Sequence, residues 1–352
     1  MKKYFLTKIK IGKKIISSKN SAFIVAEISA NHSQSLKKAL KLLRAAKKAG
    51  ADAVKLQTYK PESLSIKNVN DLKNDKIWRY KSRYELYKKA YLPWNFHSKL
   101  YNEARKLKLE IFSSPFDISS LNYLQKFKQV AYKIASPEIN DVNLINAIAQ
   151  KKLPVIASLG CAEKKDIDQL INVMKKNNNK KLILLKCTAD YPTNPKDLNL
   201  ATIQYLKKKY KCLVGFSDHT IGSGAPIASV ILGSSLIEKH IKLENEKKSV
   251  DSFFSMGDID FKNIVKEIKN AEKSIGRVTL NLGPNHTKHL KSKRSIYAIK
   301  NIGIGEKFTI RNIQSVRPAK GAHPKHYNYL IGKLSRRKIK LGTPIKLNFC
   351  KK

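Results

Sequence analysis

The chain has 352 residues, a formal net charge of +45 and 42% hydrophobic residues. This length predicts two domains, and no run of about 18 apolar residues predicts a membrane span. The lysine-rich start lacks the apolar segment of a signal peptide, and the four scattered cysteines form no C-x-x-C pair. We therefore expect a reduced, cytoplasmic protein with no membrane partner.

The positive charge comes almost entirely from lysine. Lysine pairs and triplets recur along the predicted helices, as at residues 37–38 and 207–209, whereas arginine is scarce and aromatic residues do not interleave with them. Proteins that read nucleic acid in its grooves depend on arginine. We interpret the lysines as solvated helix surface, with a weak attraction for anionic substrates, and expect no nucleic-acid partner.

The first strand–helix repeat is the clearest. Residues 22–29 form a short apolar run that predicts a buried strand, and this strand carries one carboxylate, Glu27. The leucines and alanines of residues 36–46 then keep the 3.6-residue spacing of a helix. Ser35 is placed to cap its start, and Gly50 to end it.

Two of the predicted buried strands carry a lysine. Lys55 lies within residues 53–57 and Lys133 within residues 131–135, each flanked by apolar side chains. A buried lysine is hard to explain unless it faces a ligand or a carboxylate. Alternatively, each lysine reaches an end of the barrel or pairs with a buried glutamate.

The same alternation continues along the chain. Further strands are predicted at residues 110–113, 131–135, 154–158, 182–186, 213–215 and 235–239. Further helices are predicted at residues 96–107, 119–127, 143–150, 165–175, 200–209, 225–232 and 261–275. Eight strands alternating with eight helices predict a closed (β/α)8 TIM barrel.

The barrel is expected to span residues 1–280, with a small hairpin over residues 1–20. One long polar interruption, residues 60–94, reads as a loop over the barrel mouth. A polar linker is predicted at residues 281–293. After it, short apolar runs split by glycine-containing turns predict a separate, small β-rich domain at residues 294–352.

Two histidines follow neighbouring predicted strands. His219 follows strand 213–215, and His240 is expected where strand 235–239 ends. Because the carboxyl ends of parallel strands meet at one rim of a barrel, the two imidazoles should lie side by side. They would suit a divalent metal, or each could instead be bonded to backbone.

Other polar residues gather at the same predicted rim. These are Glu27, Lys55, Gln57, Ser114, Lys133, Ser136, Glu138, Ser158, Lys186, Tyr191, Ser217, His219 and His240. Lysines together with hydroxyls from several strand ends suit a phosphate and a carboxylate on one small anion.

Several short motifs resemble one known family. They are AEISANH at 26–32, VKLQTY at 54–59, SSPFD at 113–117, YKIAS at 132–136, CT…YP at 187–192, SDHT at 217–220, EKH at 238–240, RSIYAIKNIGIGE at 294–306 and VRPAKGAHP at 316–324. This set closely resembles the sialic acid synthases over almost the whole chain. Those enzymes are phosphoenolpyruvate-dependent nonulosonate synthases with a TIM barrel and a C-terminal antifreeze-like (SAF) domain.

The resemblance also implies a branch of that family. SANH, KLQTY and residues 86–97, LYKKAYLPWNFH, look most like pseudaminic acid synthases. Such a transferase would condense phosphoenolpyruvate with 2,4-diacetamido-2,4,6-trideoxy-altrose and water. The alternative is an N-acetylneuraminate or legionaminate synthase that uses N-acetylmannosamine or another diacetamido sugar.

The resemblance further implies roles for individual residues. His219 and His240 would bind Mn²⁺ or Mg²⁺. The implied phosphoenolpyruvate contacts are Lys55, Ser114, Lys133, Ser136, Ser158 and Ser217, and the implied sugar contacts are Glu27, Gln57, Tyr191 and Asp251. Glu138 would lie close to the reacting centre, where it or Glu27 could position water or bond the sugar. Arg317 would reach the partner's sugar in a domain-swapped homodimer.

The sequence departs from the family pattern at two positions. Ala189 stands where neuraminate synthases place an asparagine near the phosphate, which is in keeping with the pseudaminate branch. Leu159 replaces the threonine of the usual STG, and nothing in the sequence explains this change. Neither departure removes a predicted metal or lysine position.

Overall fold

The computed structural model describes residues 4–72, 77–78, 80–280, 283 and 287–351. The chain forms two compact units, Met1–Gly276 and Arg277–Lys352. The predicted linker at residues 281–293 lies partly outside the described residues. Its described part contains the short helix α11 (Thr287–Leu290).

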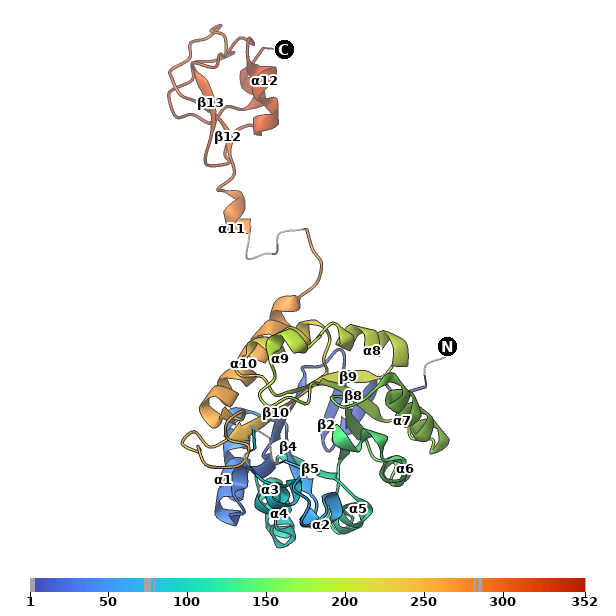
Figure 1. Cartoon of the computed structure of the whole chain (residues 1–352). Coiled ribbons are helices and arrows are strands. Elements are labelled where there is room, and N and C mark those ends of the chain that lie inside the picture. Colours follow the sequence, from blue (N-terminus) through green and yellow to red (C-terminus); the bar gives the residue numbers. More distant parts are fainter. Residues whose placement is uncertain (1–3, 73–76, 79, 281–282, 284–286, 352) are drawn as a thin grey trace. The chain divides into compact units, whose positions relative to one another are not determined.

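The described part of the first unit contains a closed barrel of eight parallel strands (Figure 1). The strands are β3 (Phe23–Glu27), β4 (Ala53–Thr58), β5 (Glu110–Pro115), β6 (Tyr132–Ile134), β7 (Val155–Ser158), β8 (Leu182–Cys187), β9 (Leu213–Asp218) and β10 (Leu236–Lys242). Strand β10 pairs with both β3 and β9, which closes the sheet. The predicted TIM barrel is confirmed.

Helices surround these strands. They are α1 (Leu36–Ala49), α4 (His97–Lys106), α5 (Ile118–Leu124), α6 (Val142–Gln150), α7 (Lys164–Lys176), α8 (Thr202–Tyr210), α9 (Gly224–Ile231) and α10 (Asp258–Ile275). Helix α1 begins and ends as its sequence predicts. The Ser35 side chain accepts a hydrogen bond from Lys38 N–H, and Gly50 ends the helix at φ 88°, a conformation that favours glycine.

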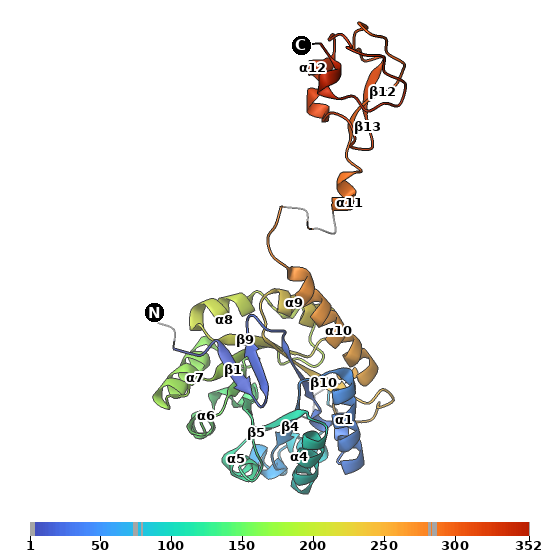
Figure 2. The same cartoon turned by 180° about the vertical axis from the view of Figure 1, so that it is seen from behind.

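The N-terminal hairpin consists of β1 (Lys8–Ile11) and β2 (Lys14–Ser17). Ile9, Ile11 and Ile16 are at most 1% exposed and pack against the first inward-facing residues of the barrel strands. The hairpin therefore covers the end of the barrel at which the strands begin (Figure 2).

Polarity changes along the barrel interior. Side chains alternate between the two faces of a strand, so Phe23 and Val25 face inward on β3 together with Glu27. On β4 the corresponding inward residues are Ala53 and Lys55. Phe23, Val25 and Ala53 belong to the apolar cluster at the hairpin end. The inward positions thus turn polar toward the carboxyl ends, which places the site there.

Several strands continue beyond their predicted ends, and two of these extensions concern the histidines. Strand β9 continues through Asp218, and β10 continues to Lys242, so His240 lies within β10 rather than at its end. The extension of β10 is explained by an additional short strand, β11 (Met256–Gly257), which pairs with β10 beyond His240. That pairing supplies hydrogen bonds that keep β10 extended.

The second unit is small and has its own core. Strands β12 (Ser295–Ala298) and β13 (Ile313–Val316) pair antiparallel, and isolated bridges connect several other segments. Helix α12 (Tyr327–Leu330) contributes Leu330 to an apolar cluster. The other fully buried members of that cluster include Ile296, Phe308, Ile313 and Ile345. This agrees with the predicted small domain built from short β segments.

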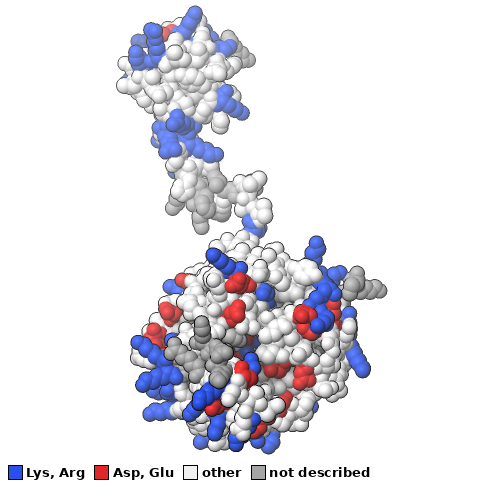
Figure 3. Space-filling model, in the orientation of Figure 1, with Lys and Arg blue, Asp and Glu red and all other residues white. Residues whose placement is uncertain are grey.

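The surface carries dispersed positive charge. On the face in Figure 3, lysine and arginine side chains are spread around the barrel and interspersed with aspartate and glutamate. This distribution agrees with solvated helix surfaces. Among the described residues, no helix is long and apolar enough to span a membrane.

Candidate active site

A cavity of about 290 Å³ opens at the carboxyl ends of the barrel strands. This volume lies at the lower end of the range for small-molecule sites, so the cavity suits small substrates. Most predicted site residues line it: Lys55, Gln57, Lys133, Ser136, Ser158, Tyr191, Ser217, His219, His240 and Asp251. The fold therefore brings together side chains that are up to 196 positions apart in the sequence, from 55 to 251.

Four predicted residues do not belong to the described cavity wall. Glu27 and Ser114 are fully buried behind it, and Glu138 follows the wall residues Ser136 and Pro137 in the sequence. Arg317 is exposed in the second unit, and its role stays a prediction.

The long segment after β4 contributes one side of the cavity. It contains α2 (Pro61–Leu64) and α3 (Arg83–Ala90). Trp78, Arg83 and Tyr87 line the same cavity as Lys55. The described part of residues 60–94 thus lies over the barrel mouth, as the sequence predicts.

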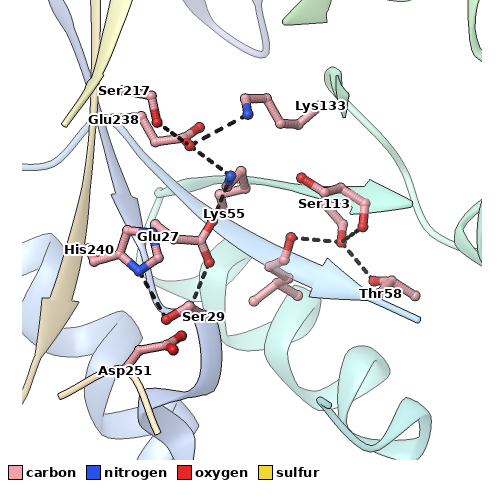
Figure 4. A network of polar contacts seen from close by, with 12 residues as sticks. Glu27, Ser29, Lys55, Thr58, Ser113, Lys133, Ser217, Glu238, His240 and Asp251 are labelled. Carbon is pink, nitrogen blue, oxygen red and sulfur yellow. Dashed lines mark hydrogen bonds and ion pairs between the residues drawn. The ribbon is translucent and has the colours of Figure 1, made fainter. Parts of the chain in front are cut away.

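A buried network of lysines and glutamates forms the floor of the cavity (Figure 4). Lys55 Nζ lies 2.8 Å from a carboxylate oxygen of Glu27 and 2.8 Å from one of Glu238. Lys133 Nζ lies 3.6 Å from the same oxygen of Glu238, to which the Ser217 hydroxyl donates a hydrogen bond of 3.2 Å. Glu238 joins both lysines.

The charges of this network nearly cancel. Burial opposes ionisation of Glu238, but Lys133 and Lys55 outweigh burial and lower its pKa to about 2. Burial lowers the pKa of Lys55 to about 8, with Glu238 opposing the change. Glu238 is therefore a carboxylate at neutral pH, and each lysine both pairs with a glutamate and faces the cavity. The pairing of the buried lysines with glutamate is thus confirmed, and their contact with an anionic ligand stays a prediction.

Hydroxyl groups beside the network have unused hydrogen-bonding capacity. Within the described residues, Ser114 Oγ and Ser158 Oγ are buried without a hydrogen-bond partner. Ser136 Oγ, in contrast, accepts a hydrogen bond of 2.9 Å from Gly160 N–H, and the Ser136 side chain also hydrogen bonds to Cys187. Buried polar groups normally have partners, so the hydroxyl of Ser158, which lines the cavity, fits an oxygen of an anionic ligand.

The two histidines lie side by side, with ring centroids 5.3 Å apart. His219 Nδ1 is 2.9 Å from the carbonyl oxygen of Thr188, and His240 Nδ1 is 3.1 Å from Ser29 Oγ. A carbonyl can only accept, so His219 Nδ1 carries a proton. Because Ser29 holds Nδ1 of His240, its Nε2 is the nitrogen left for a ligand. His219 also hydrogen bonds to the Cys187 side chain; burial lowers the pKa of His219, but Cys187 and Thr188 outweigh burial and raise it, so a metal would have to displace the Cys187 contact.

This pair fits a divalent metal that takes two protein ligands. Burial keeps the pKa of His240 well below its usual value, so this imidazole is in the neutral form that a metal needs. Among the described residues, no group of three or more His, Cys, Asp or Glu side chains is arranged to hold a metal. The remaining ligands would have to be water or substrate oxygens.

Aromatic rings enclose the histidines. The centroid of Tyr191 is 4.3 Å from that of His219, and the centroid of Phe254 is 4.7 Å from that of His240. Trp78 packs edge-on against Phe253 at 5.3 Å. These rings limit the access of water, which strengthens electrostatic interactions within the site.

A buried ion pair sits behind the histidines. Asp218 and Lys239 precede His219 and His240 in the sequence, so their side chains point to the opposite face of the sheet. They pair with each other at 3% exposure or less, and Lys239 also donates a hydrogen bond to Thr220 O at 2.8 Å. The pair fixes β9 against β10 and thereby the spacing of the histidines.

The two predicted acid–base glutamates differ sharply. Both Glu27 oxygens face donors, with Ser29 N–H at 2.6 Å and Lys55 Nζ at 2.8 Å. Glu138 Oε2 is buried and has no hydrogen-bond partner among the described residues. Burial raises the pKa of Glu138 to about 7, although Lys133 opposes the rise. Glu138 is therefore suited to proton transfer near neutral pH, whereas Glu27 is fixed in place.

The sequence analysis missed several residues of the site. Glu238 could have been found, because it occupies the inward position two residues before His240, as Lys55 does before Gln57. No comparable sequence pattern marked three other residues. Cys187 and Phe254 line the cavity, and Ser29 contacts His240. The sequence alone did not explain why leucine stands at position 159. Leu159 packs into the apolar cluster between sheet and helices, so its side chain faces away from the cavity.

A barrel whose carboxyl-end cavity brings two histidines beside a lysine–glutamate floor is typical of an enzyme site for a small anionic substrate. A model of the NeuB family matches residues 42–279, and a model of the SAF domain matches residues 293–349. The first match spans more than half of the chain. This protein belongs to the NeuB family.

Particular relatives are similar over nearly their whole length. The chain is 43% identical over 329 residues to the pseudaminic acid synthase of Campylobacter jejuni, covering 92% of this chain and 95% of that protein. It is 39% identical over 325 residues to the pseudaminic acid synthase of Helicobacter pylori, covering 92% and 96%. The crystal structure of the N-acetylneuraminic acid synthetase of Leptospira borgpetersenii superposes with a TM-score of 0.72 at 31% identity, covering 80% of this chain and 95% of that one.

Proposed function

We propose that this protein condenses phosphoenolpyruvate with 2,4-diacetamido-2,4,6-trideoxy-altrose and water, giving pseudaminic acid and phosphate. The observation that carries this proposal is one cavity in which two adjacent histidines face a lysine–glutamate floor. The branch is supported by the identities of 43% and 39% to pseudaminic acid synthases, against 31% to the sialic acid synthetase.

His219 and His240 would hold Mn²⁺ or Mg²⁺ through their Nε2 atoms. When bound, the ion supplies a Lewis acid that polarises the sugar aldehyde. The histidines keep their ring orientation through Thr188 and Ser29. Because Tyr191 and Phe254 pack against them, they work in a site with little bulk water.

The floor would bind phosphoenolpyruvate. Carbon 3 of this substrate attacks the aldehyde carbon, and positive charge develops on carbon 2. Lys55 and Lys133 would stabilise the phosphate and carboxylate groups, and the unpaired hydroxyl of Ser158 would donate to an anionic oxygen. Glu27 and Glu238 would hold the two ammonium groups in place beside the anion.

Water then adds to carbon 2, and the carbon–oxygen bond to phosphate breaks. This sequence predicts that the oxygen of the added water ends in the sugar acid and none enters the phosphate. The reaction should be run in H₂¹⁸O with phosphoenolpyruvate and the diacetamido sugar, and the released phosphate analysed by mass spectrometry. Unlabelled phosphate supports the mechanism, whereas labelled phosphate means attack at phosphorus and contradicts it.

Glu138 is the residue we assign to the proton of that water. With a pKa of about 7, its carboxylate form grows as pH rises through 7, so kcat/KM should rise over the same range. Glu138→Gln should remove this rise of kcat/KM with pH and lower kcat/KM about 100-fold or more. Glu163 is exposed, so the control variant Glu163→Gln should keep the rise of kcat/KM with pH. An unchanged pH profile in Glu138→Gln would rule out the assignment of Glu138.

The same shift has a consequence for stability. Because the pKa of Glu138 is higher in the fold than its reference value of 4.5, its contribution to stability is present below about pH 4.5 and is lost as pH rises through 7. Glu138→Gln should therefore make the thermal midpoint less dependent on pH in this range.

The domain-swapped homodimer is a second part of the proposal. Arg317 is exposed in the SAF unit and would contact the partner's sugar substrate. Arg317→Ala should raise the sugar KM about tenfold and leave the phosphoenolpyruvate KM unchanged, since a charge-assisted hydrogen bond contributes about 1.5–3 kcal/mol. Arg311→Ala, exposed in the same unit, is the control. A monomeric mass in light scattering, or an unchanged sugar KM, would reject this contact.

A further inference from the structure

Ser29 occupies a backbone position that suits glycine better than serine. It follows β3 as the first residue of a short 3₁₀ turn, is 3% exposed, and has a positive φ of 36°. A side chain in this region is strained, and the strain persists only when the surroundings hold it. Such strain is a reason to ask what the hydroxyl does.

The surroundings do hold this turn. Asn31 Nδ2 donates to Ile241 O at 2.9 Å and to Ser255 Oγ at 2.8 Å, and Asn31 Oδ1 accepts from Ser249 Oγ at 2.7 Å. These bonds tie the turn to β10 at the residue directly after His240. The backbone of Ser29 is therefore fixed beside the imidazole by contacts that do not involve its own side chain.

The side chain of Ser29 contacts two groups of the site, His240 and Asp251. Ser29 Oγ is 3.1 Å from His240 Nδ1 (Figure 4). The Ser29 side chain also hydrogen bonds to Asp251, whose Oδ2 accepts a hydrogen bond from Ala30 N–H at 3.0 Å. A carboxylate only accepts, so the hydroxyl gives its proton to Asp251 and is left to accept from His240 Nδ1–H.

We propose that Ser29 is a positioning residue that keeps the proton of His240 on Nδ1, so that Nε2 presents its lone pair to the cavity. Asp251 holds the hydroxyl in the accepting orientation, which links a residue predicted to bind the sugar with one predicted to bind the metal. The inference about metal affinity rests on the proposed function. The inference about the His240 tautomer does not rest on the proposed function, because the tautomer exists in the protein without metal or substrate.

Two variants remove the hydroxyl of Ser29, and they differ in their effect on the strained backbone. Ser29→Gly also relieves the positive φ, whereas Ser29→Ala keeps a side chain there. Ser33→Gly is the matched control, since Ser33 has a φ of 46° in the same turn but is exposed and does not contact His240. A purely structural role predicts that Ser29→Gly and Ser33→Gly behave alike.

The first measurement is nitrogen NMR of metal-free protein labelled in histidine, with His240 assigned by its loss in His240→Gln. The wild type and Ser33→Gly should show Nδ1 protonated, and both Ser29 variants should shift toward protonated Nε2. The second measurement is the Mn²⁺ dissociation constant, which should rise about 10- to 100-fold in both Ser29 variants. The thermal midpoint of Ser29→Gly should not fall below that of the wild type.

Retention of the Nδ1 proton in both Ser29 variants would overturn the proposal, whatever the affinity for Mn²⁺. A shifted tautomer with an unchanged dissociation constant would overturn its metal-binding part. If the tautomer shifts but the wild type releases no phosphate from phosphoenolpyruvate, the proposed function fails and the role of Ser29 stands.

Discussion

Replacing His219 or His240 by alanine should lower turnover at least about 100-fold while the barrel stays folded. Each histidine would supply half of the protein ligands of the metal, and Lewis-acid stabilisation contributes several kcal/mol, of which about 2.7 kcal/mol corresponds to a factor of 100. Both rings line the cavity rather than the apolar clusters between sheet and helices, so their loss should leave the fold intact.

Turnover and fold are separable in this experiment. Phosphate release at saturating substrates measures the first, and the thermal midpoint by circular dichroism measures the second. An electron paramagnetic resonance titration with Mn²⁺ should show weakened binding in both variants. Activity above a few per cent of the wild type in either variant would contradict the assignment of the metal ligands.

Lys55→Met should destabilise the protein by about 3–5 kcal/mol and abolish turnover. The substitution leaves Glu27 and Glu238 facing each other at 3% exposure or less without the shared ammonium group, and removing one partner of a buried ion pair has a cost of this size. Turnover should be lost because phosphoenolpyruvate loses a cation from the cavity floor.

A surface pair provides the control for this prediction. Lys14 pairs with Asp52 at 2.9 Å, but the Lys14 side chain is 59% exposed, so Lys14→Met should cost less than about 1 kcal/mol. Urea unfolding of both variants measures the difference. Equal losses in the free energy of unfolding would mean that Lys55 in the cavity floor stabilises the protein no more than an exposed ion pair does.

Much of the barrel could be predicted because its sequence signals are local. Apolar runs of four to six residues alternate with amphipathic helices, and caps such as Ser35 and Gly50 mark the helix ends. Strand lengths were less predictable. His240 was expected at the end of a strand, but β11 pairs beyond it and extends β10, and this partner lies 15 residues further along the chain, Ile241 pairing with Met256.

The site was predictable where polarity interrupts a buried strand. Lys55 and Lys133 stood out for that reason, and the resemblance supplied their roles. Their partner Glu238 was overlooked because a glutamate near a strand end looks like a surface residue until the barrel closes around it. Ser29 matters only through its φ angle and its contact with His240, and neither property is visible in the sequence.

The most direct test of the proposed function is phosphate release from phosphoenolpyruvate with Mn²⁺, comparing 2,4-diacetamido-2,4,6-trideoxy-altrose with N-acetylmannosamine. We predict release with the diacetamido sugar alone, together with a product of the mass of pseudaminic acid. Release with N-acetylmannosamine alone would keep the family chemistry and contradict the branch. Release with neither sugar would contradict the proposed reaction itself.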